Sequence, residues 1–121
     1  MRKITIYDTT LRDGAQAEGI FFSASAKLRL ANRLDEFKVD YIEGGFAGAN
    51  QKDMEFFREI RKHEFTHSKI VVFGPTRRAG IRVQDDEFVS SIMDACTSVV
   101  AIVGKSWDLH VSDVLQCTLE E

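Results

Sequence analysis

This 121-residue chain has little of the chemistry that marks several protein classes. It contains two cysteines, Cys96 and Cys117, which lie far apart and match no zinc or redox spacing. We expect both to be reduced thiols in a cytosolic protein. The net charge of −3 provides no basic field, which argues against nucleic acid or an anionic membrane as a partner.

Long apolar segments are also missing from the sequence. No apolar run approaches the ~20 residues needed to span a bilayer. The start, Met1-Arg2-Lys3, leads straight into a strand-like run without the apolar core of a secretory signal. We therefore expect a cytoplasmic protein. Its content of 44% hydrophobic and 29% charged residues is that of an ordinary globular domain with a real core.

What the chain does have is a recurrence of short apolar runs. Their starts lie roughly thirty residues apart, which is the length of a strand–helix unit. The four runs are Ile4–Tyr7, Val39–Ile42, Ile70–Phe73 and Val99–Val103. Because they are continuous rather than alternating, we expect parallel strands buried on both faces and covered by helices.

Helical patterns fill the spaces between these runs. The first covers Ser23–Phe37, and the second follows Asn50, an expected N-cap, with Asp53 in its first turn. The third starts near Asp85 and the fourth near Ser112, which continues to Glu120-Glu121. The side chains expected to face the core are Ala26, Leu30, Ala31, Leu34, Phe37, Met54, Phe57, Ile60, Phe88, Ile92 and Ala95.

This alternation predicts an α/β fold made of the first four β–α units of a (β/α)8 TIM barrel, with parallel strands, outer helices and an incomplete barrel. A full barrel takes about 250 residues, so we expect residues 1–121 to be the N-terminal half of a TIM-barrel catalytic domain. The alternative is a complete four-stranded α/β domain. Either version leaves two open sheet edges, which favour pairing in a homo-oligomer.

Arg12 and Asp13 are the first candidate site residues because they follow the first apolar run. Ligands bind at the carboxyl ends of strands in such folds. A carboxylate there is a hard ligand for Mg²⁺ or Mn²⁺, and a guanidinium can stabilise a developing oxyanion. The alternative is a turn with an exposed ion pair.

Glu43 is the second candidate, since it follows the second apolar run in Tyr41-Ile42-Glu43-Gly44-Gly45. Adjacent strands lie about 4.8 Å apart, so we expect it to orient Arg12 through a bidentate pair. A charge facing water is the alternative. Gln16 is positioned to hydrogen-bond a substrate from the first loop, although a solvent-facing glutamine fits the sequence equally well.

Other polar residues give weaker indications. Thr76-Arg77-Arg78 and Lys105-Ser106 would add positive charge at the same strand ends, but a solvated surface is the favoured reading. His63 and His67 fall at the opposite side of the sheet, so we reject them as metal ligands. For His110, packing against Trp107 is favoured over a contact with a ligand.

The run Asp8-Thr9-Thr10-Leu11-Arg12-Asp13-Gly14-Ala15-Gln16 resembles the first-strand motif of the DRE-TIM metallolyases. This superfamily contains isopropylmalate, homocitrate and citramalate synthases and hydroxymethylglutaryl-CoA lyase. A narrower resemblance to the citramalate synthases covers essentially the whole chain. Its segments are Gly19–Ser23, Val39–Gly45, Phe73–Arg78 and Gly104–Val111.

The resemblance implies an acyltransferase that condenses acetyl-CoA with pyruvate to give citramalate and CoA in isoleucine biosynthesis. It implies that Asp13 binds a divalent metal, Mg²⁺ or Mn²⁺ with Zn²⁺ as an alternative. It also implies that Arg12 contacts the 2-oxo acid oxygen and that Glu43 completes an arginine–aspartate–glutamate set. Related 2-oxo acid synthases, a lyase, or a noncatalytic half-barrel that self-assembles remain the rival functions.

The chain departs from this family at one point. Members supply two further metal ligands from a His-x-His on a late strand, and the sequence contains no His-x-His. One carboxylate holds Mg²⁺ weakly, because the ion requires octahedral oxygen coordination. We therefore expect the isolated chain to have no useful activity.

Overall fold

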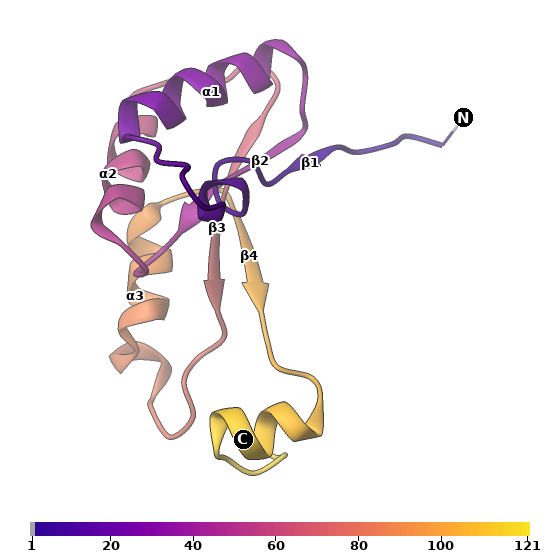
Figure 1. The fold of residues 1–121 in the computed structure, drawn as a ribbon, viewed down its shortest axis with the longest axis vertical. Coiled ribbons are helices and arrows are strands. Elements are labelled where there is room, and N and C mark those ends of the chain that lie inside the picture. Colours follow the sequence, from indigo (N-terminus) through magenta and orange to yellow (C-terminus); the bar gives the residue numbers. More distant parts are fainter. Residues whose placement is uncertain (1) are drawn as a thin grey trace.

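The computed structural model describes residues 2–121 and contains one four-stranded parallel sheet with the strand order β1-β2-β3-β4 (Figure 1). The elements are β1 (Tyr7–Asp8), η1 (Gly14–Gln16), α1 (Ala24–Glu36), β2 (Tyr41–Phe46), α2 (Gln51–Ile60), β3 (Lys69–Pro75), η2 (Val83–Asp85), α3 (Glu87–Ala95), β4 (Val99–Val103) and η3 (His110–Leu115). Strands and helices alternate, as predicted. The α/β fold class is therefore confirmed, with the strands and helices of a partial TIM barrel.

The helices begin where capping side chains satisfy their first N–H groups. Ser23 Oγ accepts from the Ala26 N–H at 3.2 Å, and Asn50 Oδ1 accepts from the Asp53 N–H at 2.8 Å. Asp86 caps α3 in the same way, with Oδ1 accepting from the N–H of Phe88. The predicted starts of the first three helices are confirmed to within two residues.

The core lies between these helices and the two central strands. β2 and β3 are largely buried, as predicted, and the most enclosed side chains include Ile42, Phe56, Phe57 and Val72. Phe37 was expected in this core but is 81% exposed. It lies just after the end of α1, so the helical face that it would have extended is already finished.

The first strand is shifted relative to the prediction of Ile4–Tyr7. Pairing begins where the Tyr41 N–H donates to the Ile6 carbonyl, because β2 starts only at Tyr41. The Ile6 N–H is taken by Asp40 Oδ2 at 2.9 Å rather than by a strand. Upstream of this point the chain runs away from the sheet, and Ile4 is 82% exposed (Figure 1).

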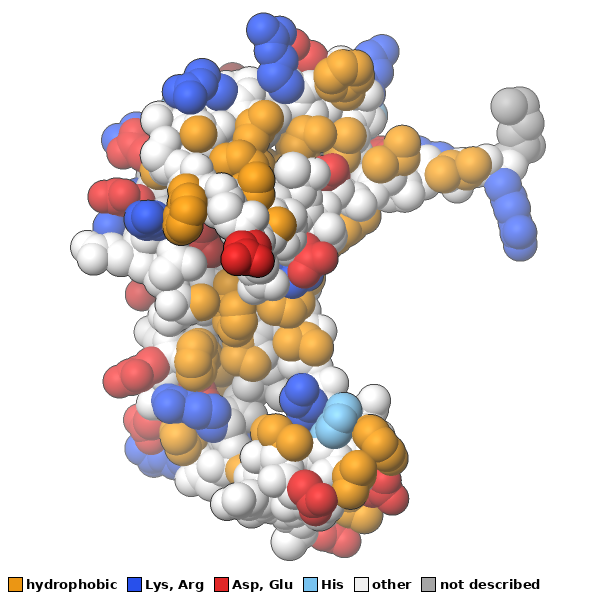
Figure 2. Space-filling view, viewed as in Figure 1, with side chains coloured by type: hydrophobic (Ala, Val, Ile, Leu, Met, Phe, Trp, Pro, Cys, Tyr) orange, Lys and Arg blue, Asp and Glu red, His pale blue; other side chains and the backbone are white. Residues whose placement is uncertain are grey.

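The fourth strand has the predicted bounds, but it is not buried on both faces. Ile102 is 61% exposed, and α1, α2 and α3 pack mainly on β2, β3 and one another. The fourth helix was expected from Ser112 to Glu121. Instead, a short π-helical segment, His110–Leu115, ends at Gln116 in the left-handed conformation. Figure 2 shows apolar side chains exposed along the middle of the molecule and on this C-terminal segment.

The central strands are longer than predicted at their carboxyl ends. Glu43, Gly44 and Gly45 lie inside β2 rather than after it, and β3 includes Pro75. The β2–β3 register shifts between Glu43 and Gly45, which marks a bulge. A Cβ on Gly45 would lie 2.7 Å from Asp53 Cγ, and one on Gly44 would clash with Phe56. The glycines therefore allow α2 to approach the strand closely.

A buried ion pair joins β2 to both neighbouring helices. Lys27 Nζ of α1 lies 2.5 Å from Asp53 Oδ1 of α2 and donates to the Gly44 carbonyl at 2.9 Å. Asp53 Oδ2 accepts from the Phe46 N–H at 2.9 Å. Side-chain exposure is only 4% for Lys27 and 8% for Asp53. We call Lys27 and Asp53 with these contacts the Lys27–Asp53 joint. Each charged atom of the joint thus has a partner, either on β2 or in the other residue of the pair.

Asp35 at the end of α1 holds the loop before β3. Its carboxylate accepts from the backbone N–H groups of Thr66, His67 and Ser68 and from the Thr66 hydroxyl. Burial tends to raise the pKa of Asp35, but these hydrogen bonds outweigh burial and hold the pKa well below its usual range.

In the part of the chain that the structure describes, no helix has both the length and the apolar character required to cross a membrane.

The Asp35 hydrogen bonds predict a specific acid sensitivity. Because the folded pKa lies below the unfolded value of about 3.9, this carboxylate stabilises the fold above that pH. The stabilisation is lost as pH falls from about 5 towards the folded pKa. We expect Asp35→Asn to lower the free energy of unfolding at pH 7, measured by urea titration. The difference in unfolding free energy between the variant and the wild type should be smaller at pH 3 than at pH 7.

The matched control for this experiment is Asp94→Asn, since Asp94 is exposed and its carboxylate makes no hydrogen bond within residues 2–121. It should change the unfolding free energy little at either pH. An Asp35→Asn variant with the wild-type stability at pH 7 would contradict the role given to Asp35.

The Lys27–Asp53 joint predicts a large effect of removing one partner. Lys27→Met leaves the Asp53 carboxylate buried without its cation, which should lower the free energy of unfolding by about 3 kcal/mol or more. Lys62→Met removes an exposed ion pair with Glu59 and should cost at most about 1 kcal/mol. Urea unfolding of both variants tests this prediction. Equal losses of unfolding free energy would show that the buried pair stabilises the fold no more than the exposed pair does.

Candidate active site

Arg12 is placed by a tight turn at the carboxyl end of β1. The Thr9 carbonyl accepts from the N–H groups of Arg12, Asp13 and Gly14, and the Asp8 carboxylate accepts from the Thr10 N–H and hydroxyl. This turn reverses the chain directly after the strand. The Arg12 side chain consequently points back over the sheet towards β2 and β3.

Glu43 is the partner of Arg12, as predicted, but the contact differs in form. Arg12 Nε lies 2.5 Å from Glu43 Oε1, whereas the second carboxylate oxygen, Oε2, accepts a short hydrogen bond from the Tyr7 hydroxyl. The expected bidentate pair is therefore wrong, because Tyr7 takes the oxygen that a second arginine nitrogen would need. Glu43 is 3% exposed and does not face water.

The aromatic ring of Phe73 on β3 fixes the plane of the guanidinium. Arg12 Cζ lies 4.2 Å from the centre of this ring, and Phe46 packs edge-on against Phe73 with ring centres 5.3 Å apart. Arg12 Nη1 contacts Asp13 Oδ1 at 3.1 Å, and Nη2 makes no hydrogen bond to any residue within 2–121. One terminal nitrogen thus remains available to an anionic oxygen.

The pKa of Tyr7 is strongly affected by this arrangement. Burial and the hydrogen bond and charge of Glu43 raise the pKa of the Tyr7 hydroxyl well above its ordinary value, while Arg12 acts in the opposite direction. The hydroxyl therefore remains a donor to Glu43 throughout the physiological range.

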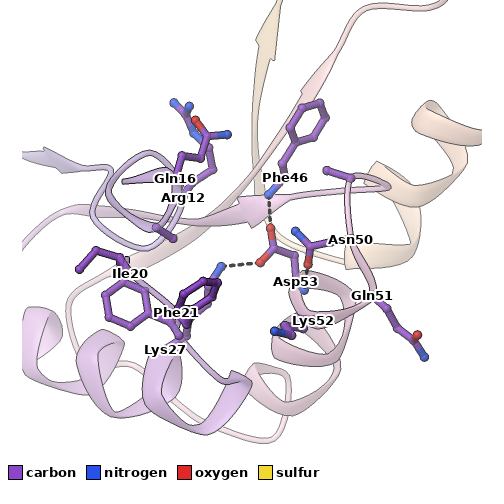
Figure 3. Close-up of a pocket in the computed structure, with 13 residues that line it drawn as sticks. Arg12, Gln16, Ile20, Phe21, Lys27, Phe46, Asn50, Gln51, Lys52 and Asp53 are labelled. Atoms are coloured by element: carbon purple, nitrogen blue, oxygen red, sulfur yellow. Dashed lines mark hydrogen bonds and ion pairs between the residues drawn. The ribbon is translucent and has the colours of Figure 1, made fainter. Parts of the chain in front are cut away.

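A cleft of about 510 Å³ opens beside Arg12 (Figure 3). Arg12 and Gln16 line it from the first loop, so the structure brings both of these predicted residues to one cavity. The remaining lining comes from the first loop, the segment before α1, α1 itself, the end of β2, the following loop and the start of α2. Those residues are Ala15, Ile20, Phe21, Phe22, Lys27, Phe46, Ala49, Asn50, Gln51, Lys52 and Asp53.

Asp13 lies at the edge of this site and does not line the cleft. Its side chain is 62% exposed, and its one described partner is Arg12. Among residues 2–121, no group of three or more histidine, cysteine or acidic side chains is arranged to hold a metal. The donors present supply one hard oxygen ligand and do not by themselves fit a complete divalent-metal site.

The weaker predictions have mixed outcomes. Arg77 and Arg78 follow β3 at the predicted strand ends, but Arg77 pairs with Glu121 and Arg78 with Asp86, so their charge is largely compensated. Lys105 lies after β4 beside a second cavity of about 420 Å³.

The histidines lie in the surroundings expected for them. His67 Nε2 lies 3.3 Å from Asp40 Oδ1, before β3 and away from Arg12, and His63 also precedes that strand. The predicted packing of His110 against Trp107 is confirmed, with ring centres 4.8 Å apart.

Sequence reasoning missed Tyr7, Phe73 and the Lys27–Asp53 joint. A lysine within the apolar stripe of α1 is a usable signal, because Lys27 and Ala31 share one helical face. Tyr7 and Phe73 read only as strand residues. Their contacts with Glu43 and Arg12 depend on strand register, which the sequence does not display.

Comparison with known proteins gives close relatives along the whole chain. (R)-Citramalate synthase from Aquifex aeolicus is 53% identical over 119 residues, which covers 98% of this chain and 22% of that enzyme. The corresponding enzyme from Sulfolobus acidocaldarius is 48% identical, covering 99% of this chain and 23% of the enzyme. The similar region is their N-terminal part.

A more distant relative, 2-isopropylmalate synthase from Bacillus velezensis, is 32% identical over 121 residues, covering 100% of this chain and 22% of the enzyme. The chain therefore spans about a fifth of the length of the curated relatives it matches.

A family model described as HMGL-like matches residues 3–121, and members of that family depend on divalent metals. Because this match extends over nearly all of the sequence that forms the four strands and the Arg12 site, the chain belongs to the HMGL-like family.

Proposed function

We propose that this chain carries part of the active site of an acyltransferase that condenses acetyl-CoA with pyruvate to give citramalate and CoA. The observation that carries the proposal is the Arg12 guanidinium, held between Glu43 and Phe73 with one terminal nitrogen available beside a cleft. The identity of about 50% to (R)-citramalate synthases supports acetyl-CoA and pyruvate as the substrates.

Arg12 has the properties needed to stabilise the new oxyanion. In the condensation, the deprotonated methyl carbon of acetyl-CoA forms a bond to the keto carbon of pyruvate. The keto oxygen takes up the electron pair as an alkoxide, which then takes up a proton to become the hydroxyl group of the product. Hydrolysis of the thioester by one water then releases CoA and citramalate. A fixed guanidinium beside that oxygen offsets the developing charge without reorganising.

Glu43 and Gln16 support this role from two sides. Glu43 orients Arg12 through the Nε contact. Gln16 lines the same cleft from η1, and we expect its amide to hydrogen-bond the carboxylate or keto oxygen of a bound 2-oxo acid. The base that removes the acetyl proton is not assigned to any residue of this chain.

Asp13 is the residue we assign to a divalent metal, Mg²⁺ or Mn²⁺ with Zn²⁺ as the alternative. Its exposed carboxylate supplies one hard oxygen ligand at a strand end, and the other ligands have to come from other groups. Such an ion would supply Lewis-acid polarisation of the keto group when bound.

We assign residues 1–121 to the N-terminal half of a TIM-barrel catalytic domain in a cytoplasmic enzyme of isoleucine biosynthesis. The strand order β1-β2-β3-β4 and the helical cover of β2 and β3 support the barrel. The exposed edge strands, with Tyr7 on β1 and Ile102 on β4, favour a homo-oligomer.

A second candidate is condensation with a larger 2-oxo acid, as the similarity to a 2-isopropylmalate synthase indicates. The higher identity to the citramalate synthases favours pyruvate. An assay that offers pyruvate and 2-oxoisovalerate separately distinguishes the two by kcat/KM.

The proposal predicts that this chain can replace its counterpart in an active relative. In a chimera, the matching segment of the Aquifex aeolicus enzyme is exchanged for this chain, and CoA release is followed with acetyl-CoA and pyruvate. We expect turnover in the usual enzyme range of ~1 s⁻¹ or more, with Arg12→Ala lowering kcat by ~100-fold or more because an oxyanion donor is lost.

Arg33→Ala serves as the control, since Arg33 forms an exposed pair with Glu36 on α1 and should leave kcat within twofold. A chimera that folds but does not turn over would reject the proposed activity. An Arg12→Ala variant within tenfold of the parent would reject the oxyanion role alone.

The isolated 121-residue chain should behave differently under the same assay with Mn²⁺. One carboxylate holds the ion weakly, so we expect turnover far below ~1 s⁻¹. Turnover that reaches the chimera's value would show that the chain carries a complete site.

A further inference from the structure

We propose that Tyr7 is a positioning residue for the reaction, which holds Glu43 in single contact with Arg12 and thereby keeps Arg12 Nη2 available to the substrate oxygen. The inference rests on the proposed function of Arg12. It deepens that function by naming the group that sets the orientation of the guanidinium.

Strand register brings Tyr7 to Glu43. Tyr7 of β1 pairs with Tyr41 of β2, and the two rings stack with centres 6.1 Å apart. Glu43 lies two residues beyond Tyr41, so both side chains leave β2 on the same face. The Tyr7 side chain therefore reaches diagonally across one strand spacing to donate its hydroxyl to Glu43 Oε2.

The two oxygens of the Glu43 carboxylate have different partners. Arg12 Nε contacts Oε1, and the Tyr7 hydroxyl occupies Oε2. An arginine and a carboxylate that meet without such a competitor tend to form two parallel hydrogen bonds, using Nε and one terminal nitrogen. Tyr7 prevents this second bond because it already supplies the donor that Oε2 requires.

Because Glu43 is buried, the choice of donor to its Oε2 atom has a large energetic effect. Glu43 is 3% exposed, so water is a poor substitute for a lost donor, and an unsatisfied buried oxygen is costly. Without the Tyr7 hydroxyl, Glu43 Oε2 would recruit the nearest remaining donor, the terminal nitrogen of Arg12. That rearrangement turns the guanidinium towards Glu43, so that Nη2 is no longer free to bind a substrate oxygen.

Tyr7→Phe tests this with little effect on the fold, because the ring and its stacking on Tyr41 remain. In the active chimera we expect kcat and kcat/KM for pyruvate to fall together by about tenfold, with KM within twofold. The reason is that the weakened contact, from Arg12 Nη2 to the substrate oxygen, is made in the transition state. The thermal unfolding temperature should change little, because Tyr7 is 43% exposed and loses only its hydroxyl.

Tyr41→Phe is the matched control. It removes a hydroxyl from the neighbouring strand that makes no hydrogen bond within residues 2–121, so kcat should stay within twofold. A Tyr7→Phe variant as active as the parent chimera would overturn the inference. An equal loss in both variants would overturn it as well, because the effect would then belong to ring polarity and not to Glu43.

A second measurement on the 121-residue chain does not depend on turnover. The chain has two tyrosines, so Tyr41→Phe leaves Tyr7 as the single phenol. Absorbance near 295 nm should show Tyr7 still protonated above its ordinary pKa of about 10, at pH values where circular dichroism shows the chain folded. Adding Glu43→Gln should lower the pKa of Tyr7 from its wild-type value, because the hydroxyl then loses its charged acceptor.

The kinetic experiment and the tyrosine titration together distinguish a failure of the proposed function from a failure of the inference about Tyr7. An inactive chimera with the expected tyrosine titration would reject the proposed function while supporting the Tyr7–Glu43 contact. Ionisation of Tyr7 near pH 10 with Glu43 in place would overturn the inference whatever the kinetics show.

Discussion

The contact between Arg12 and Glu43 is the interaction on which the candidate site depends. It ties the loop after β1 to the middle of β2, and it sets a cation at the carboxyl end of a parallel sheet, where ligands of such folds bind. The neighbours of the pair define its geometry. Phe73 supports one face of the guanidinium, and Tyr7 limits Glu43 to a single contact with Arg12. A charge that would be mobile on a surface loop is thereby preorganised.

The shape of β2 makes this contact possible. The closeness of α2 to the bulge at Glu43–Gly45 requires glycine, because a Cβ on Gly45 would meet the Asp53 carboxylate. Lys27 and Asp53 then fasten the end of the strand to α1 and α2 through the Gly44 carbonyl and the Phe46 N–H. Packing, a buried ion pair and the geometry of the candidate site are consequently coupled through a few residues of one strand.

Much of this architecture follows from local patterns. Caps at Ser23 and Asn50, apolar strand runs and the spacing of strand–helix units were sufficient for the α/β order. The positions of Arg12 and Glu43 after the first two apolar runs were sufficient to predict that they meet. The sequence was a poorer guide at the edges and across strands. Ile4 and Ile102 look buried because they are apolar, yet their exposure depends on which elements cover β1 and β4. Tyr7 and the Lys27–Asp53 joint depend on register and helix packing, which no local pattern encodes.

The most direct test of the account is the arginine Nε–H resonance of Arg12 in proton–nitrogen NMR spectra of the 121-residue chain. With Glu43 in place, this proton is held against a buried carboxylate, and we predict that it exchanges with water far more slowly than the Nε–H of exposed Arg33. In Glu43→Gln the protection should be lost. An Arg12 Nε–H that exchanges as fast as that of Arg33 in the wild-type chain would contradict the preorganised ion pair at the centre of the account.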